Sequence, residues 1–437
     1  MKRTGRSRVK LRVIASLTGL VCLLGACGDG SDSGATQGVT DDTIVIGSHQ
    51  PLTGPAAPGY SNISKGAKAY FDHVNAEGGI NGRKIEYRYR DDAYNPTQTV
   101  TASKELVLED RIFAMMGGLG TPTHTKVIDF LNAQKVPDLF VGSGCACWDN
   151  PRKYSRTFGW QPDYIIEGKI LGNHIKHQYP GKKVAYFYQD DDFGNEGVEG
   201  LDKALPADSV VSRQSYQPKG TDIAPQVSAI AASKADVVVI FALPAYTALF
   251  KLVSLKLNYK PTTVVSSVSA DPTNLNTLLK TYAKQVGGNA GSGDLADGII
   301  TASYLPPNTE TSNSWIKLFR RIHNQYTPKA PFDLNIVYGM SQAYTFAQAL
   351  QAAGKDLTRD SLVKALEKGG FTGPGLVPLE YSSTSHSGYK GEQIGTIKGS
   401  KLALQGTPQV TDNGDGPITS YTTAQPQAPA NGIPSKE

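Results

Sequence analysis

The sequence lacks the short signatures of several enzyme classes. It contains no phosphate-binding loop of the form G-x-x-x-x-G-K-[ST], no H-E-x-x-H, no G-x-S-x-G and no complete dinucleotide-binding fingerprint. Asp192, Phe193 and Gly194 form the Asp-Phe-Gly tripeptide of kinases, but the other kinase motifs are missing. The sequence therefore predicts no enzyme of these classes and no cofactor.

The chain also lacks the basic surface that nucleic-acid binding requires. Its net charge is +5, but six Lys and Arg residues precede residue 27 and no acid accompanies them there. These six residues account for more than the whole excess, so the remaining chain is close to neutral. We therefore expect no nucleic-acid partner. The six are Lys2, Arg3, Arg6, Arg8, Lys10 and Arg12.

Long apolar runs are absent beyond the N-terminal leader, residues 1–26. The leader has a basic start, an apolar stretch from Val13 and small residues at its end, which together indicate a secretory signal. Its last residues and Cys27 read LGAC, which is similar to the lipobox of bacterial lipoproteins, in which the cysteine is acylated. The alternative is an ordinary signal peptide with an incidental cysteine. The polar stretch 27–42 is typical of a tether, so we expect an exported protein, lipid-anchored to the outer face of the bacterial membrane.

Cysteine is scarce, with four residues in 437. Cys22 belongs to the leader and Cys27 is the expected lipid carrier, so Cys145 and Cys147 remain for the folded part. Two cysteines alone cannot supply a four-ligand structural zinc site, and we expect no metal. In an oxidising compartment the two either form a local disulfide or remain reduced and buried.

What the sequence does contain is a regular alternation of strands and helices. The stretch GGINGRKIEYRYRDD, residues 78–92, shows the unit. Two glycines end a helix whose apolar stripe runs from Ile63 to Val74, and Asn81 and Gly82 form a turn. A strand follows in which Ile85, Tyr87 and Tyr89 alternate with charged residues. This order is a helix-to-strand return in a βαβ unit.

The alternation continues to about residue 400. It predicts an α/β fold with doubly wound parallel sheets, and there are too many strands for one sheet, so we expect two lobes. Residues 407–437, rich in Pro, Thr and Gln, are expected to be disordered. Further strands are predicted at 113–117, 138–142, 184–189, 209–215, 235–243, 262–267 and 298–303, with a weak one near 393–399. Helices are predicted at 61–77, 97–110, 122–135, 163–178, 194–204, 222–233, 245–256, 311–326, 334–353 and 360–368.

Ligands of such sheets bind beyond the carboxyl ends of the strands, which directs attention to polar residues there. Asp91 and Asp92 end the strand that begins at Lys84, and we expect them at the rim of a ligand cleft. Asp190, Asp191 and Asp192 end another strand. They either bind a cation or act as a general acid, or they cap the following helix. His174 and His177 lie three apart on a helix, a spacing that fits a metal or a solvated helix face.

The segment GGLGTPTH, residues 117–124, lies between a strand and a helix. Its glycines permit close approach of a ligand to the backbone, and the helix N-terminus offers free N–H groups and a positive dipole end. Thr121 and Thr123 add hydroxyl donors. These features favour a carboxylate or another compact anion, and the alternative is a tight turn with a capping threonine.

Four separate segments, in order, resemble the leucine/isoleucine/valine-binding family. They are IVIGSHQPLTGPAA, HVNAEGGINGRKIEYRYRDDAYNP, VPDLFVGSG and NIVYGMSQAYTFAQALQAAGKDLTRDSLVKALE. The resemblance covers about residues 40–405. It implies the type I binding-protein fold, with one lobe formed by residues 43–158 and 303–380 and the other by residues 159–302 and 381–406. It also implies a small-molecule ligand between the lobes and an ABC permease as the membrane partner of a monomer.

The resemblance also implies ligand contacts. The hydroxyl that holds the ligand carboxylate falls on Thr121, and strand-end contacts fall on Gly142, Ser143 and Gly144. An aromatic platform falls on Phe193, and another contact loop on Pro244 to Tyr246, which includes Ala245. The family's tyrosine near the first helix aligns with Gly59, so Tyr60, one residue later, is the candidate.

The family's acid that pairs with the ligand ammonium is missing. It falls near Ser267, Val268 or Ser269, where no acid is present. A buried ammonium without a counter-charge costs several kcal/mol. Either another acid serves, such as Asp271 or one of Asp190 to Asp192, or the ligand is not an α-amino acid. A carboxylate or amide with an apolar body fits these residues better than leucine.

We therefore expect an extracytoplasmic solute-binding lipoprotein of an ABC importer, without catalytic activity. Its ligand would be a branched-chain amino acid or a related small carboxylate or amide. One alternative is a lipid-anchored sensor of the same fold that reports to a membrane kinase or cyclase. The other is an exported hydrolase that uses Asp190 to Asp192.

Overall fold

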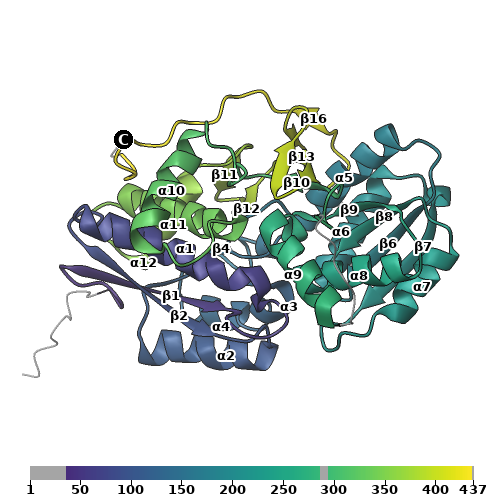
Figure 1. The fold of residues 1–437 in the computed structure, drawn as a ribbon. Helices are drawn as coiled ribbons and strands as arrows, with labels where there is room; N and C mark the ends of the chain where they lie inside the picture. Colours follow the sequence, from purple (N-terminus) through teal and green to yellow (C-terminus); the bar gives the residue numbers. More distant parts are fainter. Residues whose placement is uncertain (1–35, 286–293, 436–437) are drawn as a thin grey trace, which may run out of the picture. The chain divides into compact units, whose positions relative to one another are not determined.

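A computed structural model describes residues 36–285 and 294–435 (Figure 1). The predicted signal of residues 1–26, the expected lipidation at Cys27 and most of the predicted tether lie outside the described residues. Among the helices within that range, none combines the length and the apolar character needed to cross a bilayer.

Two sheets organise the described chain, and we define a lobe by each (Figure 1). The first lobe contains a five-stranded sheet of order β2-β1-β3-β4-β5, in which every neighbouring pair is parallel. Helices α1, α10, α11 and α12 pack with it. Its strands are β1 Thr43–Gln50, β2 Lys84–Asp91, β3 Ala114–Met116, β4 Asp138–Val141 and β5 Thr157–Gly159. The helices are α1 Ala57–Ala76, α10 Ser314–Tyr326, α11 Leu334–Ala353 and α12 Arg359–Lys368.

The second lobe contains a nine-stranded sheet in which β7, β6, β8, β9 and β10 are parallel and β13 pairs antiparallel with β10. Its strands are β6 Val184–Gln189, β7 Val210–Tyr216, β8 Val237–Phe241, β9 Thr262–Val265, β10 Ile300–Ser303, β13 Gly391–Lys398, β14 Lys401–Leu404, β15 Gln409–Val410 and β16 Thr419–Ser420. Its helices are α5 Tyr164–Gln178, α6 Asp192–Ala204, α7 Ala224–Ala232, α8 Pro244–Lys256 and α9 Pro272–Gln285. A two-stranded sheet, β11 Leu379–Ser382 with β12 Ser385–Tyr389, precedes β13. The predicted doubly wound α/β architecture is confirmed.

The return from α1 to β2 has the local geometry that its sequence predicts. Gly78 and Gly79 have φ values of 100° and 79°, and the Gly79 N–H closes the helix end on Val74 O at 2.8 Å. Asn81 and Gly82 also have positive φ, 52° and 88°. Residues Ile80 and Arg83 exchange two backbone hydrogen bonds around them. Two positive φ values in succession are typical of a type I′ turn, which favours Asn-Gly.

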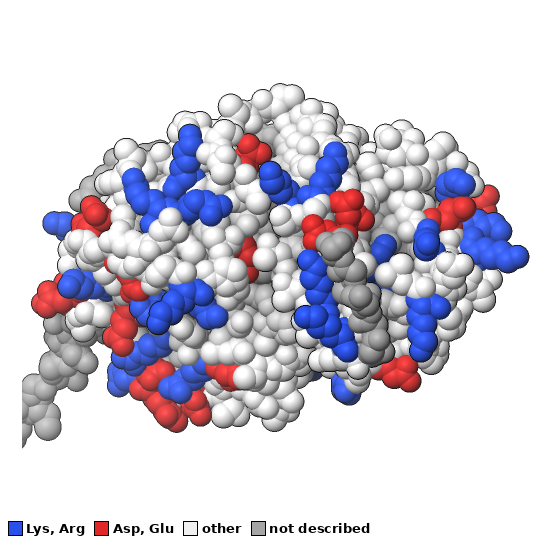
Figure 2. Space-filling view, in the orientation of Figure 1, with Lys and Arg blue, Asp and Glu red and all other residues white. Residues whose placement is uncertain are grey.

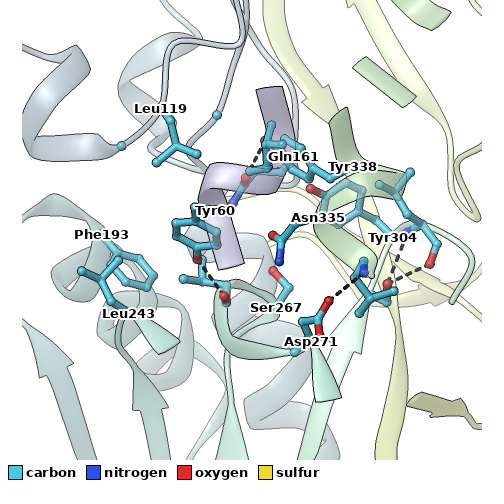
Figure 3. Close-up of a pocket in the computed structure, with 18 of the residues that line it drawn as sticks. Tyr60, Leu119, Gln161, Phe193, Leu243, Ser267, Asp271, Tyr304, Asn335 and Tyr338 are labelled. Atoms are coloured by element: carbon cyan, nitrogen blue, oxygen red, sulfur yellow. Dashed lines mark hydrogen bonds between the residues drawn. The ribbon is translucent and has the colours of Figure 1, made fainter. Parts of the chain in front are cut away.

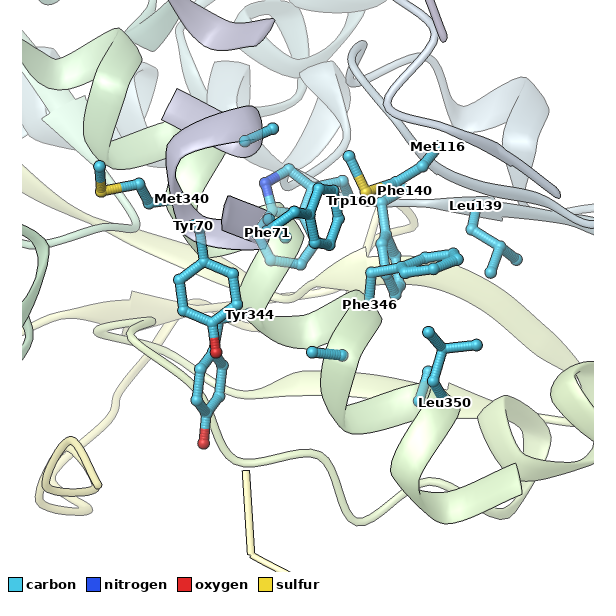
Figure 4. Packing of buried hydrophobic residues seen from close by; sticks show 14 of the residues in the cluster. Tyr70, Phe71, Met116, Leu139, Phe140, Trp160, Met340, Tyr344, Phe346 and Leu350 are labelled. Atoms are coloured by element: carbon cyan, nitrogen blue, oxygen red, sulfur yellow. The ribbon is translucent and has the colours of Figure 1, made fainter. Parts of the chain in front are cut away.

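Aromatic residues dominate the core of the first lobe (Figure 4). Tyr70 and Phe71 of α1 lie against Tyr344 and Phe346 of α11, with ring centroids 6.0 and 6.2 Å apart. The α1 stripe predicted from Ile63 to Val74 is buried. At about 25 cal/mol per Å² of apolar surface, such rings are the largest single contributors to the stability of this layer.

Two helices differ from the prediction. The helix predicted at 122–135 is two short pieces, α3 Thr121–His124 and α4 Ile128–Ala133. Threonine hydroxyls compete for the backbone here: Thr123 Oγ1 donates to Leu119 O at 2.6 Å, and Thr125 Oγ1 donates to Thr121 O at 2.9 Å. The helix predicted at 97–110 is α2 Pro96–Lys104, continued by a π-helical turn, Glu105–Glu109.

Helix α9 was not predicted, although the sequence carries its signal. Pro272 is its first residue, and Leu275, Leu278 and Leu279 are buried at helical spacing. The strands β5, β11, β12 and β14 were likewise not predicted. These strands are short, and glycine or serine residues weaken the alternation of β5, β11 and β12.

The expected disorder of the C-terminal segment is wrong for residues 407–435. Strand β15 pairs with β13 and β16 pairs with β15. The segment then lies along α10 and α1, where Trp315 Nε1 donates to Pro426 O at 2.6 Å and Tyr70 OH to Gly432 O at 2.7 Å. Its composition suggests disorder because it holds few apolar residues. Its backbone nevertheless finds partners among side chains far away in the sequence, and proline lowers the entropy that is lost on ordering.

Candidate functional site

A cavity lies between the two lobes, at the carboxyl ends of their strands (Figure 3). The centre of a water molecule can occupy about 90 Å³ of it. The lining is mostly apolar or aromatic, with a few amide and hydroxyl groups. From the first lobe come Tyr60, Ile63, Tyr94, Leu119, Gly120, Thr121, Gly142, Leu334, Asn335, Val337 and Tyr338. From the second lobe and the segments that connect the lobes come Gln161, Tyr164, Phe193, Leu243, Ser267, Val268, Ala270, Asp271, Ala302, Ser303, Tyr304 and Leu305.

Direct hydrogen bonds join the lobes around this cavity. Tyr60 OH donates to Val268 O at 2.7 Å, and the Leu334 N–H donates to Asp271 Oδ2 at 2.6 Å (Figure 3). Asn274 Nδ2 donates to Pro58 O at 3.0 Å. These bonds pair groups that would otherwise face solvent in an open cleft. The structure therefore shows the closed arrangement of the lobes.

Gly59 allows this close approach. It lies at a kink in α1 with φ 91°, and a Cβ there would lie 2.2 Å from Asn274 Nδ2 of the other lobe. Only glycine fits both the backbone conformation and the contact. The family's tyrosine aligns with this glycine, and Tyr60 points into the cavity instead (Figure 3).

Buried acids carry much of the electrostatics around the cavity. Burial, together with the charge of Asp271, raises the pKa of Asp333 to about 7. Burial also raises the pKa of Asp271, although backbone N–H groups favour its charged form. Glu196 of α6 accepts the Ala146 N–H of the first lobe at 2.9 Å, and burial raises its pKa to about 8. Acid pairs and buried carboxyls of this kind concentrate at functional sites.

Six of the predicted site residues line the cavity together. They are Tyr60, Thr121, Gly142, Phe193, Ser267 and Val268. Asp271, named as a replacement acid, also lines it. Its two oxygens are already engaged, since Oδ1 accepts the Asn274 N–H at 2.8 Å and Oδ2 accepts the Leu334 N–H.

Four other predicted site residues do not line the cavity. Ser143 lies behind Thr121, with their hydroxyl oxygens 2.7 Å apart, and Gly144 O accepts the Tyr164 N–H at 2.7 Å. Ala245 is buried in the second lobe. Tyr246 stacks on Tyr216 at 4.2 Å, and its hydroxyl donates to Gly220 O.

The expectation that Asp91 and Asp92 reach the cleft rim is wrong. Asp91 accepts the N–H groups of Leu52 and Thr53 and so fixes the loop after β1. Asp92 is fully buried against His49. Tyr94, two residues further on, lines the cavity instead.

The acids at the end of β6 also lie outside the cavity lining. The hydrolase hypothesis requires them inside it. Asp191 caps α6 by accepting the Phe193 N–H at 3.1 Å, and it accepts Gln189 Nε2 at 2.6 Å. Asp190 accepts Gln217 Nε2 at 2.9 Å. The helix-capping interpretation accounts for these contacts. His177 donates within its own helix, to Asn173 O, and in the described chain no cluster of three or more metal-ligating side chains forms.

Cys145 and Cys147 are joined by a disulfide in the structure. The pair follows the strand-end contacts of the first lobe, and Trp148 packs behind it, with Nε1 donating to Ser143 O at 3.1 Å. The disulfide therefore supports the loop behind Thr121 without lining the cavity.

Sequence reasoning missed most of the polar lining. Gln161, Tyr164, Ser303, Tyr304, Asn335 and Tyr338 were not named as site residues. Gln161 and Tyr304 lie on segments that connect the lobes, which periodicity does not reveal. Asn335 and Tyr338 belong to a segment, NIVYGMSQ, that carried the family resemblance. Their position in the first turns of α11, after the cap residue Asp333, was the available signal.

These features define a two-lobed α/β protein that encloses a small cavity between its lobes. The model of the periplasmic binding protein family matches residues 43–401, and the chain belongs to this family. The predicted membership of the leucine/isoleucine/valine-binding type is thereby confirmed.

Known proteins agree with this assignment. The Leu/Ile/Val-binding protein homolog 3 of Brucella melitensis is 27% identical over 198 residues, which cover 45% of this chain and 53% of that protein. The aligned part thus spans about half the length of that relative. The branched-chain amino acid ABC transporter of Thermus thermophilus, solved with bound valine, is 19% identical with a TM-score of 0.74 and covers 86% of this chain and 98% of that chain. The fatty acid ABC transporter substrate-binding protein of Thermomonospora curvata is 22% identical with a TM-score of 0.73. The match covers 88% of this chain and 98% of that chain. The two structures show the shared fold.

Proposed function

We propose that this protein is the solute receptor of an ABC importer, which captures one small molecule between its lobes and delivers it to a permease. The observation that carries the proposal is the closed interlobe cavity, in which apolar walls surround a few polar groups. Such a cavity binds ligands by stabilising the closed arrangement of the lobes over the open one.

The ligand class follows from size and lining. A branched-chain amino acid or a related small carboxylate or amide fits a cavity of this volume and apolar character. The relatives support this range, since their names include leucine, isoleucine and valine binding, and one structural neighbour is named for fatty acids. The protein acts by binding and release, without turnover of the ligand.

A thermal-shift screen of the purified chain tests the proposal. Amino acids, short carboxylates, amides and aromatic acids should include at least one compound that raises the melting temperature, because a ligand that binds only the folded state stabilises it. A ligand at one hundred times its Kd stabilises by about 2.7 kcal/mol. A broad screen without any stabiliser would count against a solute receptor.

We further propose that the protein is exported and held at the membrane by a lipid on Cys27. The leader and the residues Leu24 to Cys27 support this. Substitution of Cys27→Ala should release the protein from the membrane fraction of a bacterial host. Retention of the variant in that fraction would contradict the lipid anchor. Association of the closed form with a permease rather than with a membrane kinase distinguishes an importer from a sensor.

A further inference from the structure

The C-terminal segment, residues 407–435, spans both lobes (Figure 1). Its yellow ribbon runs from β15 and β16, at the sheet of the second lobe, to α10 and α1 of the first. In the described chain, three other stretches join the lobes: between β5 and α5, between β10 and α10, and between β12 and β13. The segment is therefore a fourth connection, and it lies beyond residue 401, where the family match ends. We call residues 407–435 the C-terminal strap.

The first half of the C-terminal strap is anchored on the second lobe. Strand β15 pairs antiparallel with β13, and β16 pairs with β15. Lys169 of α5 is buried and donates to three carbonyl oxygens of the strap, those of Asp412, Gly414 and Gly416. Hydrogen bonds from a charged donor contribute about 1.5–3 kcal/mol each. This half of the strap therefore moves with the second lobe.

The second half is anchored on the first lobe by hydrogen bonds to α10 and α1. They join Trp315 Nε1 to Pro426 O (2.6 Å), Ser314 Oγ to the Ala428 N–H (3.0 Å), Tyr70 OH to Gly432 O (2.7 Å) and His73 Nε2 to Asn431 O (2.7 Å). Tyr70 and Trp315 belong to the buried core of this lobe. Each would leave a polar group without a partner if the strap detached, at a cost of about 1–3 kcal/mol. This half therefore moves with the first lobe.

Residues 421–424 link the two anchors. Residues 422–424 are exposed, and no hydrogen bond joins them to another described residue. From Ser420 to Gln425 the chain can extend over at most about 18 Å. Pro426 and Pro429, at the start of the second anchor, restrict the backbone there. A rotation that separates the anchors beyond this reach has to break the hydrogen bonds of one of them.

We propose that the C-terminal strap limits the rotation of the two lobes about their hinge and keeps the ligand-free protein close to the closed arrangement. A protein restrained in this way loses less conformational freedom when it closes on a ligand. The inference concerns the hinge and goes beyond the proposed function. Its test needs no ligand, so its failure would leave the solute-receptor function untouched.

The test cuts the strap after the protein has folded. A recognition site for a sequence-specific protease is inserted between Thr423 and Ala424 of the full chain, and the purified protein is compared before and after cleavage. The matched control carries the same site between Gly181 and Lys182. These residues lie in an exposed loop that joins α5 to β6 within the second lobe, so a cut there leaves every connection between the lobes intact.

Two backbone N–H groups report closure, because their acceptors lie in the other lobe. The Leu334 N–H donates to Asp271 Oδ2 at 2.6 Å, and the Ala146 N–H donates to Glu196 Oε2 at 2.9 Å. Opening of the lobes frees both groups, so their hydrogen exchange, measured by mass spectrometry, follows the open population. Cutting the strap should raise both exchange rates at least about threefold, and the control cut should leave them unchanged.

Two outcomes would overturn the inference. One is an unchanged exchange rate at Leu334 and Ala146 after the strap is cut, which would mean that the other three connections alone set the hinge. The second concerns residues 340–346, in the middle of α11, whose N–H groups bond within their own helix. If their exchange rises as much as that of Leu334, the cut has loosened the first lobe itself and the strap does not act on the hinge.

Discussion

His49 and His124 form a direct hydrogen bond in the core of the first lobe, with Nε2 of His49 2.8 Å from Nδ1 of His124. The outer nitrogen of each ring meets a carboxylate: His49 Nδ1 lies 2.7 Å from Asp92 and His124 Nε2 lies 2.8 Å from Asp138. All four side chains are fully buried. We call Asp92, His49, His124 and Asp138 the buried row. It lies directly beneath Gly118, where a Cβ would come within 2.6 Å of both rings. It therefore supports the loop that carries Leu119 and Thr121 into the cavity.

The first prediction concerns this row. Substitution of His49→Gln should destabilise the fold by about 2–4 kcal/mol, because it leaves Asp92 and His124 buried without a full set of partners. Urea denaturation measures the loss, and the exposed His177→Gln is the control. A loss as small as that of His177→Gln would show that the row does not stabilise the loop.

The row also predicts a pH dependence. Burial lowers the pKa of His49 below 6.5, and this outweighs the opposing effect of Asp92. The unfolded chain therefore binds a proton that the folded chain does not, and the contribution of His49 to stability falls as the pH drops below about 6.5. The difference in unfolding free energy between the protein and His49→Gln should shrink from pH 7.5 to pH 5.5. A difference that grows toward acid pH would contradict this direction.

A second pH effect, of opposite sign, is predicted for the acids behind Ser267. Burial raises the pKa of Glu167 to about 7, and burial with the charge of Glu167 raises that of Glu392 well above its ordinary range. Neither carboxylate oxygen of Glu392 has a hydrogen-bond partner among the described residues. The folded chain thus binds protons that the unfolded chain has lost above pH 4.5, so stability falls as the pH rises through 7.

Substitution of Glu392→Gln removes the buried charge and should stabilise the protein at pH 8 by about 1–3 kcal/mol, with a smaller effect at pH 5. Melting curves at both pH values measure it, and the exposed Glu109→Gln serves as the control. Equal effects at the two pH values would mean that Glu392 does not titrate in this range.

The C-terminal segment yields a prediction about Lys169. Its ammonium group, on the buried side of α5, is held by Asp412 O at 2.7 Å, Gly414 O at 2.9 Å and Gly416 O at 3.1 Å. Lys169→Met should release this loop and cost about 1–3 kcal/mol, because hydrogen bonds to a charged donor are lost. Limited proteolysis should then cut within residues 407–420. Lys176→Met, exposed on the same helix, should leave the segment protected, and equal cleavage of both variants would refute the role of Lys169.

Gly59 provides a test of lobe closure. Gly59→Ala places a methyl group against Asn274 and should both strain the backbone and weaken ligand binding. Gly78→Ala is the matched control, because its φ of 100° is similar but a Cβ there meets no atom within 4 Å. Both should lose about 1–2 kcal/mol of stability from the positive φ. Only Gly59→Ala should lose ligand affinity as well, and an equal affinity for the two variants would argue that α1 does not control closure.

Charged side chains of both signs lie on the visible face of the molecule. Figure 2 shows basic and acidic side chains interspersed over both lobes. Such mixed surface charge adds little to the stability of the fold, since exposed ion pairs contribute about 0–1 kcal/mol each.

Local patterns predicted much of the fold correctly. Strand β6 has the predicted bounds, and α11 runs from Leu334 to Ala353 as predicted. Both are runs of mostly buried residues, and adjacent residues mark their length. The Asn81-Gly82 turn was predictable for the same reason, because only a few adjacent residues decide its geometry. Where side chains compete with the backbone, as in 121–125, the periodicity was misleading.

The sequence by itself determined the α/β alternation, the turn chemistry and the family, because these depend on neighbours a few residues apart. Only the tertiary structure decided which side chains meet in the cavity, since its walls come from many separate segments of both lobes. It also decided that Asp271 is already engaged by two backbone N–H groups, and that residues 407–435 are ordered. Hydrogen bonds between distant groups settle these points, and no local pattern encodes a distant partner.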